Sequence, residues 1–116
     1  MARLLGLHEV ELRPEVDPAE YERVFATEVA ASAAPPGMTA HLLKGERGVR
    51  AGKLMWLFEL EDAELLYRYF PQPDESSEEL LRFLAEHPES AAAWDKLHSL
   101  EVAGSDTVTD YVVVVE

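Results

Sequence analysis

The sequence predicts an α+β fold in which strands and helical regions follow in the order β-α-β-β-α-β. Three observations carry this prediction. Residues 53–60 form a nearly continuous apolar run without Gly or Pro, which is typical of a buried strand. Residues 17–32 begin with helix-capping residues and continue with apolar residues at helical spacing. Residues 107–116 contain four consecutive valines, which favour a strand because β-branched side chains fit a pleated sheet.

The N-terminal part predicts one strand and one helix. Residues 3–13 alternate in polarity, which indicates a strand with His8, Val10 and Leu12 on one face. Asp17 can cap the following helix, and Pro18 suits its first position. We expect this helix to reach about residue 32, ahead of two prolines that cannot continue it.

The central part predicts a hairpin followed by an interrupted helical region. Residues 38–44 form the second strand, and the glycine-rich segment 45–52 connects it to the third strand, 53–60. Helical pieces are expected at 62–70, from the capping box at 76–79, and from His87-Pro88 to about Gly104; prolines or capping residues separate them.

Length and composition narrow the function classes. At 116 residues the chain is expected to form a single domain, residues 1–116. It contains no cysteine, which excludes disulfides and thiolate metal sites. The net charge of −13 disfavours binding to nucleic acids and to anionic membranes. No signal peptide or membrane-spanning run is recognised, so a cytoplasmic protein is expected.

The element order is that of the ferredoxin-like split βαβ motif. Right-handed crossovers place the first and third strands centrally, in an antiparallel sheet with helices on one face. Leu54, Trp56, Phe58 and Leu60 are expected under the helices. The other face, which we expect to include Met55 and Leu57 with the C-terminal valines, is too apolar for water, so a homodimer through this sheet face is predicted.

The chain resembles the dimeric α+β barrel superfamily over nearly its full length. The resemblance rests on the element order, on the last strand at residues 109–115, and on residues 7–12 leading to Asp17 and Pro18. Members include antibiotic-biosynthesis-type monooxygenases, haem-degrading and chlorite-dismutating enzymes, muconolactone isomerases, ethyl-tert-butyl-ether-degradation-type proteins and stress-responsive proteins. The resemblance implies the fold, a homodimer and a cleft between sheet and helices. It does not select a chemistry, because a fold does not fix a function.

His8, His41 and Glu59 are the candidate catalytic residues. In the predicted topology they lie toward the same end of the sheet, and they converge if the strand registers agree. Two imidazoles and a carboxylate could hold a metal ion or form a general base oriented by an acid. The alternative is three separate polar residues at strand ends, since a one-residue slip reverses the face of a side chain.

Aromatic residues crowd the enlarged helical region and suggest a ligand-binding cleft, with residues 71–77 as its lid. The alternative is that they form the core between the helices and the sheet. The candidate ligand-binding residues are Met55, Tyr67, Tyr69, Phe70, Phe83 and Trp94.

Two further groups of residues could bind ligands. Lys44, Arg47, Arg50 and Lys53 could bind an anion or dock on an acidic partner subunit; the alternative is a solvated hairpin. His87 and His98 could ligate haem or a metal, or they could be a helix cap and a rim residue respectively.

The candidate residues are compatible with three alternative functions. The first is a homodimer that binds a small apolar or aromatic molecule between sheet and helices. The second is a cofactor-independent monooxygenase or isomerase acting on an aromatic or polyketide-like substrate, with His8 or His41 as base. The third is a structural or regulatory dimer without a pocket. No motif for a nucleotide, a zinc ion or a serine nucleophile is recognised, so neither a cofactor nor a metal is expected.

Overall fold

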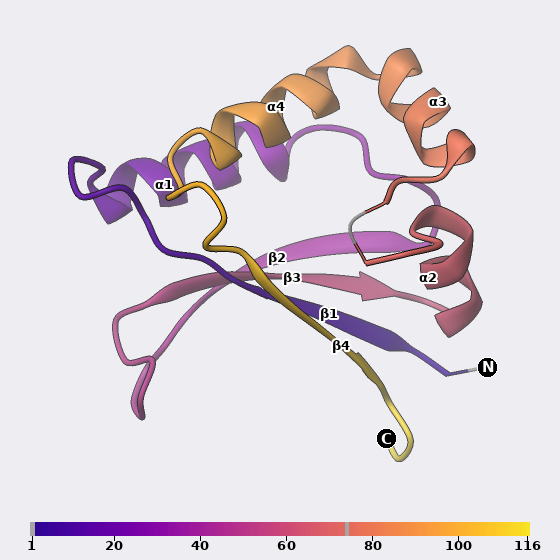
Figure 1. The fold of residues 1–116 in the computed structure, drawn as a ribbon, viewed down its shortest axis with the longest axis horizontal. Helices are drawn as coiled ribbons and strands as arrows, with labels where there is room; N and C mark the ends of the chain where they lie inside the picture. The colour runs from indigo at the N-terminus through magenta and orange to yellow at the C-terminus, as the bar shows by residue number, and fades with distance from the viewer. Residues whose placement is uncertain (1, 74) are drawn as a thin grey trace.

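The structure is a computed structural model that describes residues 2–73 and 75–116. Helices and strands follow in the predicted order (Figure 1). The elements are β1 (Leu4–Glu9), α1 (Pro18–Val24), the π-helix η1 (Phe25–Val29), β2 (Met38–Lys44), β3 (Leu54–Leu60), α2 (Ala63–Tyr69), α3 (Glu78–Glu86), α4 (Pro88–His98) and β4 (Thr107–Val112).

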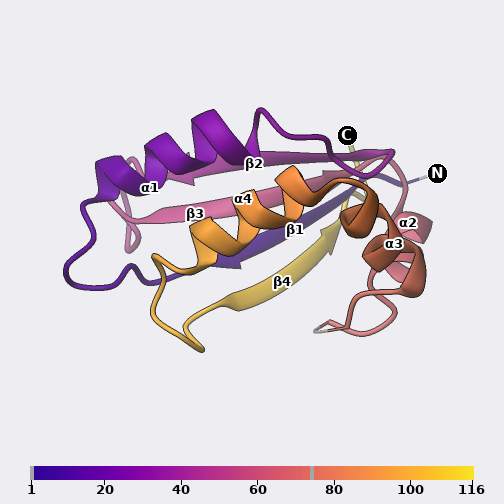
Figure 2. The same ribbon diagram turned by 90° about the horizontal axis from the view of Figure 1, so that it is seen from above.

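The four strands form one antiparallel sheet in the order β2-β3-β1-β4. The prediction that the first and third strands are central is therefore confirmed. Helices α1 and α4 run across one face of the sheet, while α2 and α3 lie toward one end of it (Figures 1 and 2). The opposite face, called the open face below, carries no helix among the residues that the structure describes.

The register of the strands decides which side chains point toward the helices. Leu4 lies opposite Leu60, and His8 lies opposite Trp56, so all four share one face. Leu54, Trp56 and Leu60 are buried in the core, and Phe58 packs against it. The prediction that this register of β3 lies under the helices is confirmed.

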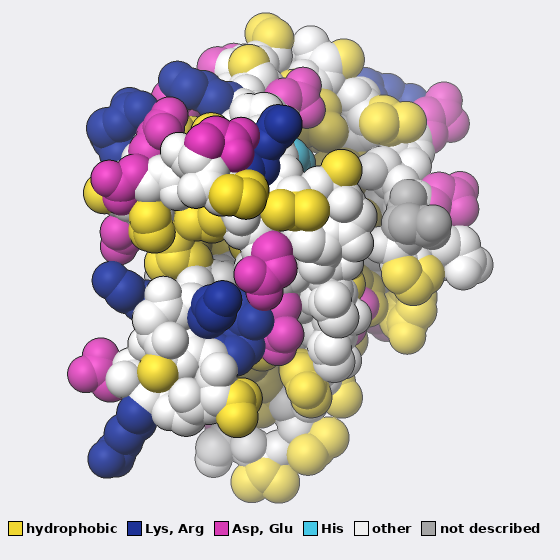
Figure 3. Space-filling model, turned by 60° about the vertical axis from the view of Figure 1, so that its left-hand side comes forward, with side chains coloured by type: hydrophobic (Ala, Val, Ile, Leu, Met, Phe, Trp, Pro, Cys, Tyr) yellow, Lys and Arg dark blue, Asp and Glu magenta, His cyan; other side chains and the backbone are white. Residues whose placement is uncertain are grey.

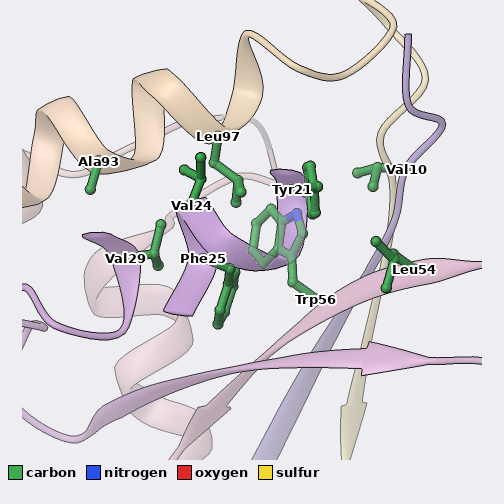
Figure 4. Packing of buried hydrophobic residues seen from close by; sticks show 9 residues of the cluster. All are labelled: Val10, Tyr21, Val24, Phe25, Val29, Leu54, Trp56, Ala93 and Leu97. Atoms are coloured by element: carbon green, nitrogen blue, oxygen red, sulfur yellow. The ribbon is translucent and has the colours of Figure 1, made fainter. Parts of the chain in front are cut away.

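The main core joins the first helix, α4 and the middle of the sheet (Figure 4). Val24 and Phe25 meet Leu97 from α4, and the indole of Trp56 lies among them. A second, smaller cluster occupies the end of the sheet near α2 and α3; it comprises Leu4, Leu60, Tyr69 and Leu80. The two clusters hold the helices to the sheet at separate places, which leaves room for a cavity between them.

The first helix begins as predicted but changes its winding. Asp17 caps it, since its Oδ1 accepts from the backbone N–H of Ala19 at 2.9 Å. From Phe25 the helix widens into a π-helical turn, closed by the bond from the N–H of Ala30 to the carbonyl of Phe25 at 2.8 Å. The widened turn still points Phe25 and Val29 into the core.

The first and last strands are both shorter than predicted. β1 ends at Glu9, because the chain from there onward bonds to the segment after α4, with the N–H of Val102 donating to the carbonyl of Glu11 at 2.8 Å. β4 ends at Val112, which lies opposite Leu4, the first residue of β1. One more backbone bond follows, from the N–H of Val113 to the carbonyl of Arg3 at 2.8 Å, and in the described part of the chain no strand lies beside the residues after it.

The C-terminal valines therefore do not build the apolar face that the sequence suggested. Val114 and Val115 are exposed beyond the end of the strand. The apolar centre of the open face comes instead from four half-buried residues of the two central strands: Leu5, Leu7, Met55 and Leu57.

None of the helices in the described ranges combines the length and the apolar character that a membrane crossing requires.

Candidate functional site

A cavity of about 650 Å³ lies between the sheet and the helices. Its floor is the helix-facing side of the sheet, and α2, α3 and α4 contribute to its walls. Gly6 lies in the floor, where a side chain would crowd Asp110, because its Cβ atom would stand 2.9 Å from Oδ1 of that residue. Its lining includes Gly6, His8, Trp56, Phe58, Tyr67, Phe70, Ala91, Trp94, Asp95, His98, Asp106 and Asp110.

One wall of the cavity is a continuous aromatic surface. The ring of Trp56 lies 4.8 Å from that of Trp94, measured between centroids, and 4.9 Å from that of Phe58. Phe70 extends the surface, with its ring 6.2 Å from that of Phe58. Such rings offer faces and edges for stacking against a flat apolar ligand.

His8 marks the polar end of this wall. Its ring stacks on Trp56 at 3.6 Å with an interplanar angle of 9°, and its Nδ1 lies 3.2 Å from Oδ1 of Asp106. Burial lowers the pKa of His8, and this outweighs the nearby charges of Asp106 and Asp110, which raise it. The imidazole is therefore neutral at pH 7. In that form Nδ1–H donates to Asp106, and Nε2 carries a free lone pair.

His98 reaches the same cavity from the end of α4, and its pKa shifts in the opposite direction. Its Nδ1 lies 3.2 Å from Oε1 of Glu101, and the hydroxyl of Tyr21 donates to Oε2 of Glu101 at 2.7 Å. The hydrogen bond to Glu101 raises the pKa of His98, and it outweighs the effect of burial. The nearby negative charges act in the same direction. His98 is thus more readily protonated than an ordinary histidine.

The two histidines should give the stability of the protein opposite pH dependences. A raised pKa makes His98 stabilise the fold most below about pH 6.5, and this contribution is lost as pH rises through its folded pKa. A lowered pKa makes His8 stabilise the fold above that pH, and its contribution is lost as pH falls.

The stability advantage of the wild type over His98→Asn should therefore shrink as pH rises. The advantage over His8→Asn should shrink as pH falls. Urea unfolding between about pH 5 and pH 8 measures both differences. Differences that change with pH in the same direction would contradict these assignments.

The structure brings together only some of the predicted site residues. His8, Tyr67, Phe70 and Trp94 line the cavity, as do Pro71, Gln72, Pro73 and Ser76 of the predicted lid, of which residue 74 lies outside the described residues. The other three ligand-binding candidates lie elsewhere: Met55 on the open face, Tyr69 in the core, where its hydroxyl donates to the carbonyl of Pro36 at 2.7 Å, and Phe83 stacked on His87.

The expected convergence of His8, His41 and Glu59 does not occur. His41 and Glu59 lie on the open face, where Nε2 of His41 is 3.4 Å from Oε2 of Glu59. His8 points to the helix face, because it is in register with Trp56 whereas His41 is in register with the next residue, Leu57. Among the described residues, no group of three His, Asp or Glu side chains is placed to hold a metal ion.

Asp106, Asp110, Glu101 and Gly6 belong to the site but do not stand out in the sequence. A usable signal is present: Val108 and Val112 alternate with Asp110, which places a carboxylate on the apolar face of a strand. For His98 the sequence suggests a haem or metal ligand or a rim residue; it lies in the cavity wall, with its side chain partly exposed.

The basic hairpin is partly neutralised within the chain. Arg50 lies 3.6 Å from Glu9, and Lys53 lies 3.6 Å from Glu11. Figure 3, which looks from the hairpin side, shows Lys and Arg side chains next to Asp and Glu side chains. Arg50 also donates to the carbonyl of Leu54 at 3.1 Å, so part of this positive charge serves the hairpin itself.

No protein-family model matches the chain, and no curated protein matches it. Several solved structures match it, and two of them do so at nearly full length. One is a dimeric protein of unknown function and ferredoxin-like fold from Bacteroides fragilis NCTC 9343, with 17% identity and a TM-score of 0.52 over 96% of each chain. The other is a dimeric ferredoxin-like protein of unknown function from Thermobifida fusca YX, with 13% identity and a TM-score of 0.54 over 97% of this chain and 92% of that one. The fold is ferredoxin-like. At such identities the likeness extends to the fold alone.

Proposed function

We propose that the protein is a homodimer that binds a small aromatic or apolar molecule in the cavity between its sheet and its helices. The observation that carries this proposal is the aromatic-walled cavity of about 650 Å³. Small-molecule sites are typically apolar clefts of about 300–1,000 Å³ with a few placed polar groups. The aromatic wall and the polar end at His8 fit that description.

The dimer is supported by the open face of the sheet. Its centre consists of Leu5, Leu7, Met55 and Leu57, which no described helix covers. Apolar residues gathered on one uncovered face favour pairing with a second copy around a two-fold axis. The two similar solved structures are both described as dimeric. In such a dimer the sheets meet face to face, and each cavity lies on the outer side of its own sheet.

The charged side chains in the cavity wall determine which ligands the cavity favours. Asp95, Asp106 and Asp110 lie in its wall, and the described part of the wall contains neither lysine nor arginine. An anion would meet repulsion from these carboxylates in a partly desolvated space. The ligand is accordingly a neutral or cationic aromatic molecule.

N-phenyl-1-naphthylamine, a neutral dye that fluoresces when it enters apolar surroundings, tests this proposal. We expect saturable binding to the wild type, because the rings of the dye can lie against Phe58 and Trp94 in the cavity wall. Ala91→Phe should weaken binding at least about tenfold by filling the cavity, whereas Ala92→Phe, at the exposed neighbouring position, should bind as the wild type does. The 8-sulfonate of the same dye should bind more weakly because of its negative charge.

The outcomes are distinct. Equal binding by Ala91→Phe and Ala92→Phe would place the dye elsewhere and contradict the cavity as its site. Absence of saturable binding to the wild type would overturn the ligand-binding function. Thermal unfolding of both variants checks that each is folded.

A further inference from the structure

We infer that the cavity is a proton-transfer site for enolisable aromatic ketones, with His8 as the general base and His98 as the general acid. This inference rests on the proposed ligand-binding function of the same cavity. Both imidazoles line the cavity, and each has its Nδ1 beside a carboxylate, at 3.2 Å from Asp106 and from Glu101 respectively. A carboxylate at Nδ1 fixes the orientation of an imidazole and leaves Nε2 for a substrate.

The two rings are placed around one aromatic platform. The ring of His8 lies 3.6 Å from that of Trp56, and the ring of His98 lies 5.9 Å from it. A flat substrate that stacks on the aromatic wall therefore lies close to both imidazole rings. Of the chain's four histidines, the other two lie outside this arrangement, His41 on the open face and His87 at the start of α4.

The groups around the rings assign the two roles. Asp106 and Asp110 act on His8, but burial and the proximity of His98 keep it neutral. Glu101, Asp106 and Asp95 act on His98 and favour its protonated form. A pair of titratable groups whose surroundings drive their pKa values apart is the usual arrangement of an acid and a base at one site.

The chemical step is a keto–enol isomerisation. Nε2 of His8 takes a proton from the carbon next to the carbonyl, and the electron pair of that C–H bond forms the C=C bond of the enol. The π bond of the carbonyl breaks, its electron pair moves onto the oxygen, and this pair takes the proton from Nε2–H of His98. The substrate neither gains nor loses electrons, and the two histidines return to their starting states by exchanging protons with water. This isomerisation therefore uses neither an oxidant nor a cofactor.

The experiment uses 2-tetralone, a neutral aromatic ketone with an acidic C–H group, in D₂O. We expect the wild-type protein to accelerate deuterium uptake at C1, followed by ¹H NMR, above the rate given by free imidazole at the same concentration. His8→Asn should lower the protein-dependent rate by about 100-fold or more, while Asn can still donate to Asp106. His87→Asn replaces a histidine outside the cavity and should keep the wild-type rate.

The pH profile separates the acid from a residue with a merely structural role. The rate should rise as His8 loses its proton, below about pH 6.5, and fall as His98 loses its proton, above that pH. His98→Asn should lower the rate and abolish the falling limb. A falling limb that persists in this variant would remove His98 from the mechanism.

Two results would overturn the inference. One is a wild-type protein that binds N-phenyl-1-naphthylamine yet exchanges 2-tetralone no faster than free imidazole does; ligand binding would then stand without proton transfer. The other is a ¹⁵N NMR spectrum in which His8 carries its proton on Nε2 at neutral pH, since that nitrogen could not act as a base. A wild-type protein that does not bind the dye would instead contradict the proposed function itself.

Discussion

Leu57→Asp is expected to convert the proposed homodimer into monomers. Leu57 lies at the centre of the open face, in register with Leu7 on one side and His41 on the other. In a dimer paired through this face, a carboxylate at residue 57 would lose its hydration among apolar side chains, and the neighbouring His41 already faces Glu59 at 3.4 Å. We expect this to cost about 3 kcal/mol or more, or roughly 100-fold in the dissociation constant. Light scattering at micromolar protein concentration measures the change in mass.

Leu81→Asp is the matched control for this change. Leu81 is an exposed leucine on α3, away from the open face, so its replacement should leave the dimer intact. A wild-type protein that is monomeric at micromolar concentration would contradict the dimer. A Leu57→Asp variant that keeps the mass of a dimer would show that subunits pair through another surface. Circular dichroism confirms that both variants remain folded.

Trp56→Ala is expected to lower the free energy of unfolding by about 3–5 kcal/mol. Only 3% of Trp56 is exposed; it packs into the main core and stacks on His8. Such a loss is a large share of the roughly 5–15 kcal/mol that typically stabilises a domain. Trp94→Ala should cost less, because Trp94 is only half-buried beside the cavity. Urea unfolding of both variants gives the comparison, and equal losses would contradict the central place of Trp56.

Much of the fold was predictable because hydrophobic periodicity and connection rules constrain it strongly. Residues 53–60 could be placed in the middle of the sheet, and the apolar side chains at 54, 56, 58 and 60 favoured the register that turns Trp56 toward the helices without fixing it. The ends of the first and last strands were not predictable in this way. Val113 to Val115 have the composition of a strand, but a strand extends only as far as its neighbour, and β1 begins at Leu4.

The candidate site was predicted only in part, because a site depends on register. His8 shares its face with Val10 and Leu12, which pack into or against the core, so the sequence already contained a reason to place it under the helices. His41 lies on the other face, because side chains alternate between the two faces of a strand and His41 is in register with Leu57. Asp106 is 98 residues from His8 along the chain, and nothing local in the sequence indicates that the two side chains meet.

The aromatic wall gives the molecule an optical property of its own. The chain contains two tryptophans, and both belong to the wall of the cavity, with their rings 4.8 Å apart. Every photon that tryptophan emits from this protein therefore originates beside the space where a ligand would lie. A change in the intensity or wavelength of that emission reports on the occupant directly. The unlabelled protein is thus its own sensor, and compounds of any chemical class can be screened against it in solution.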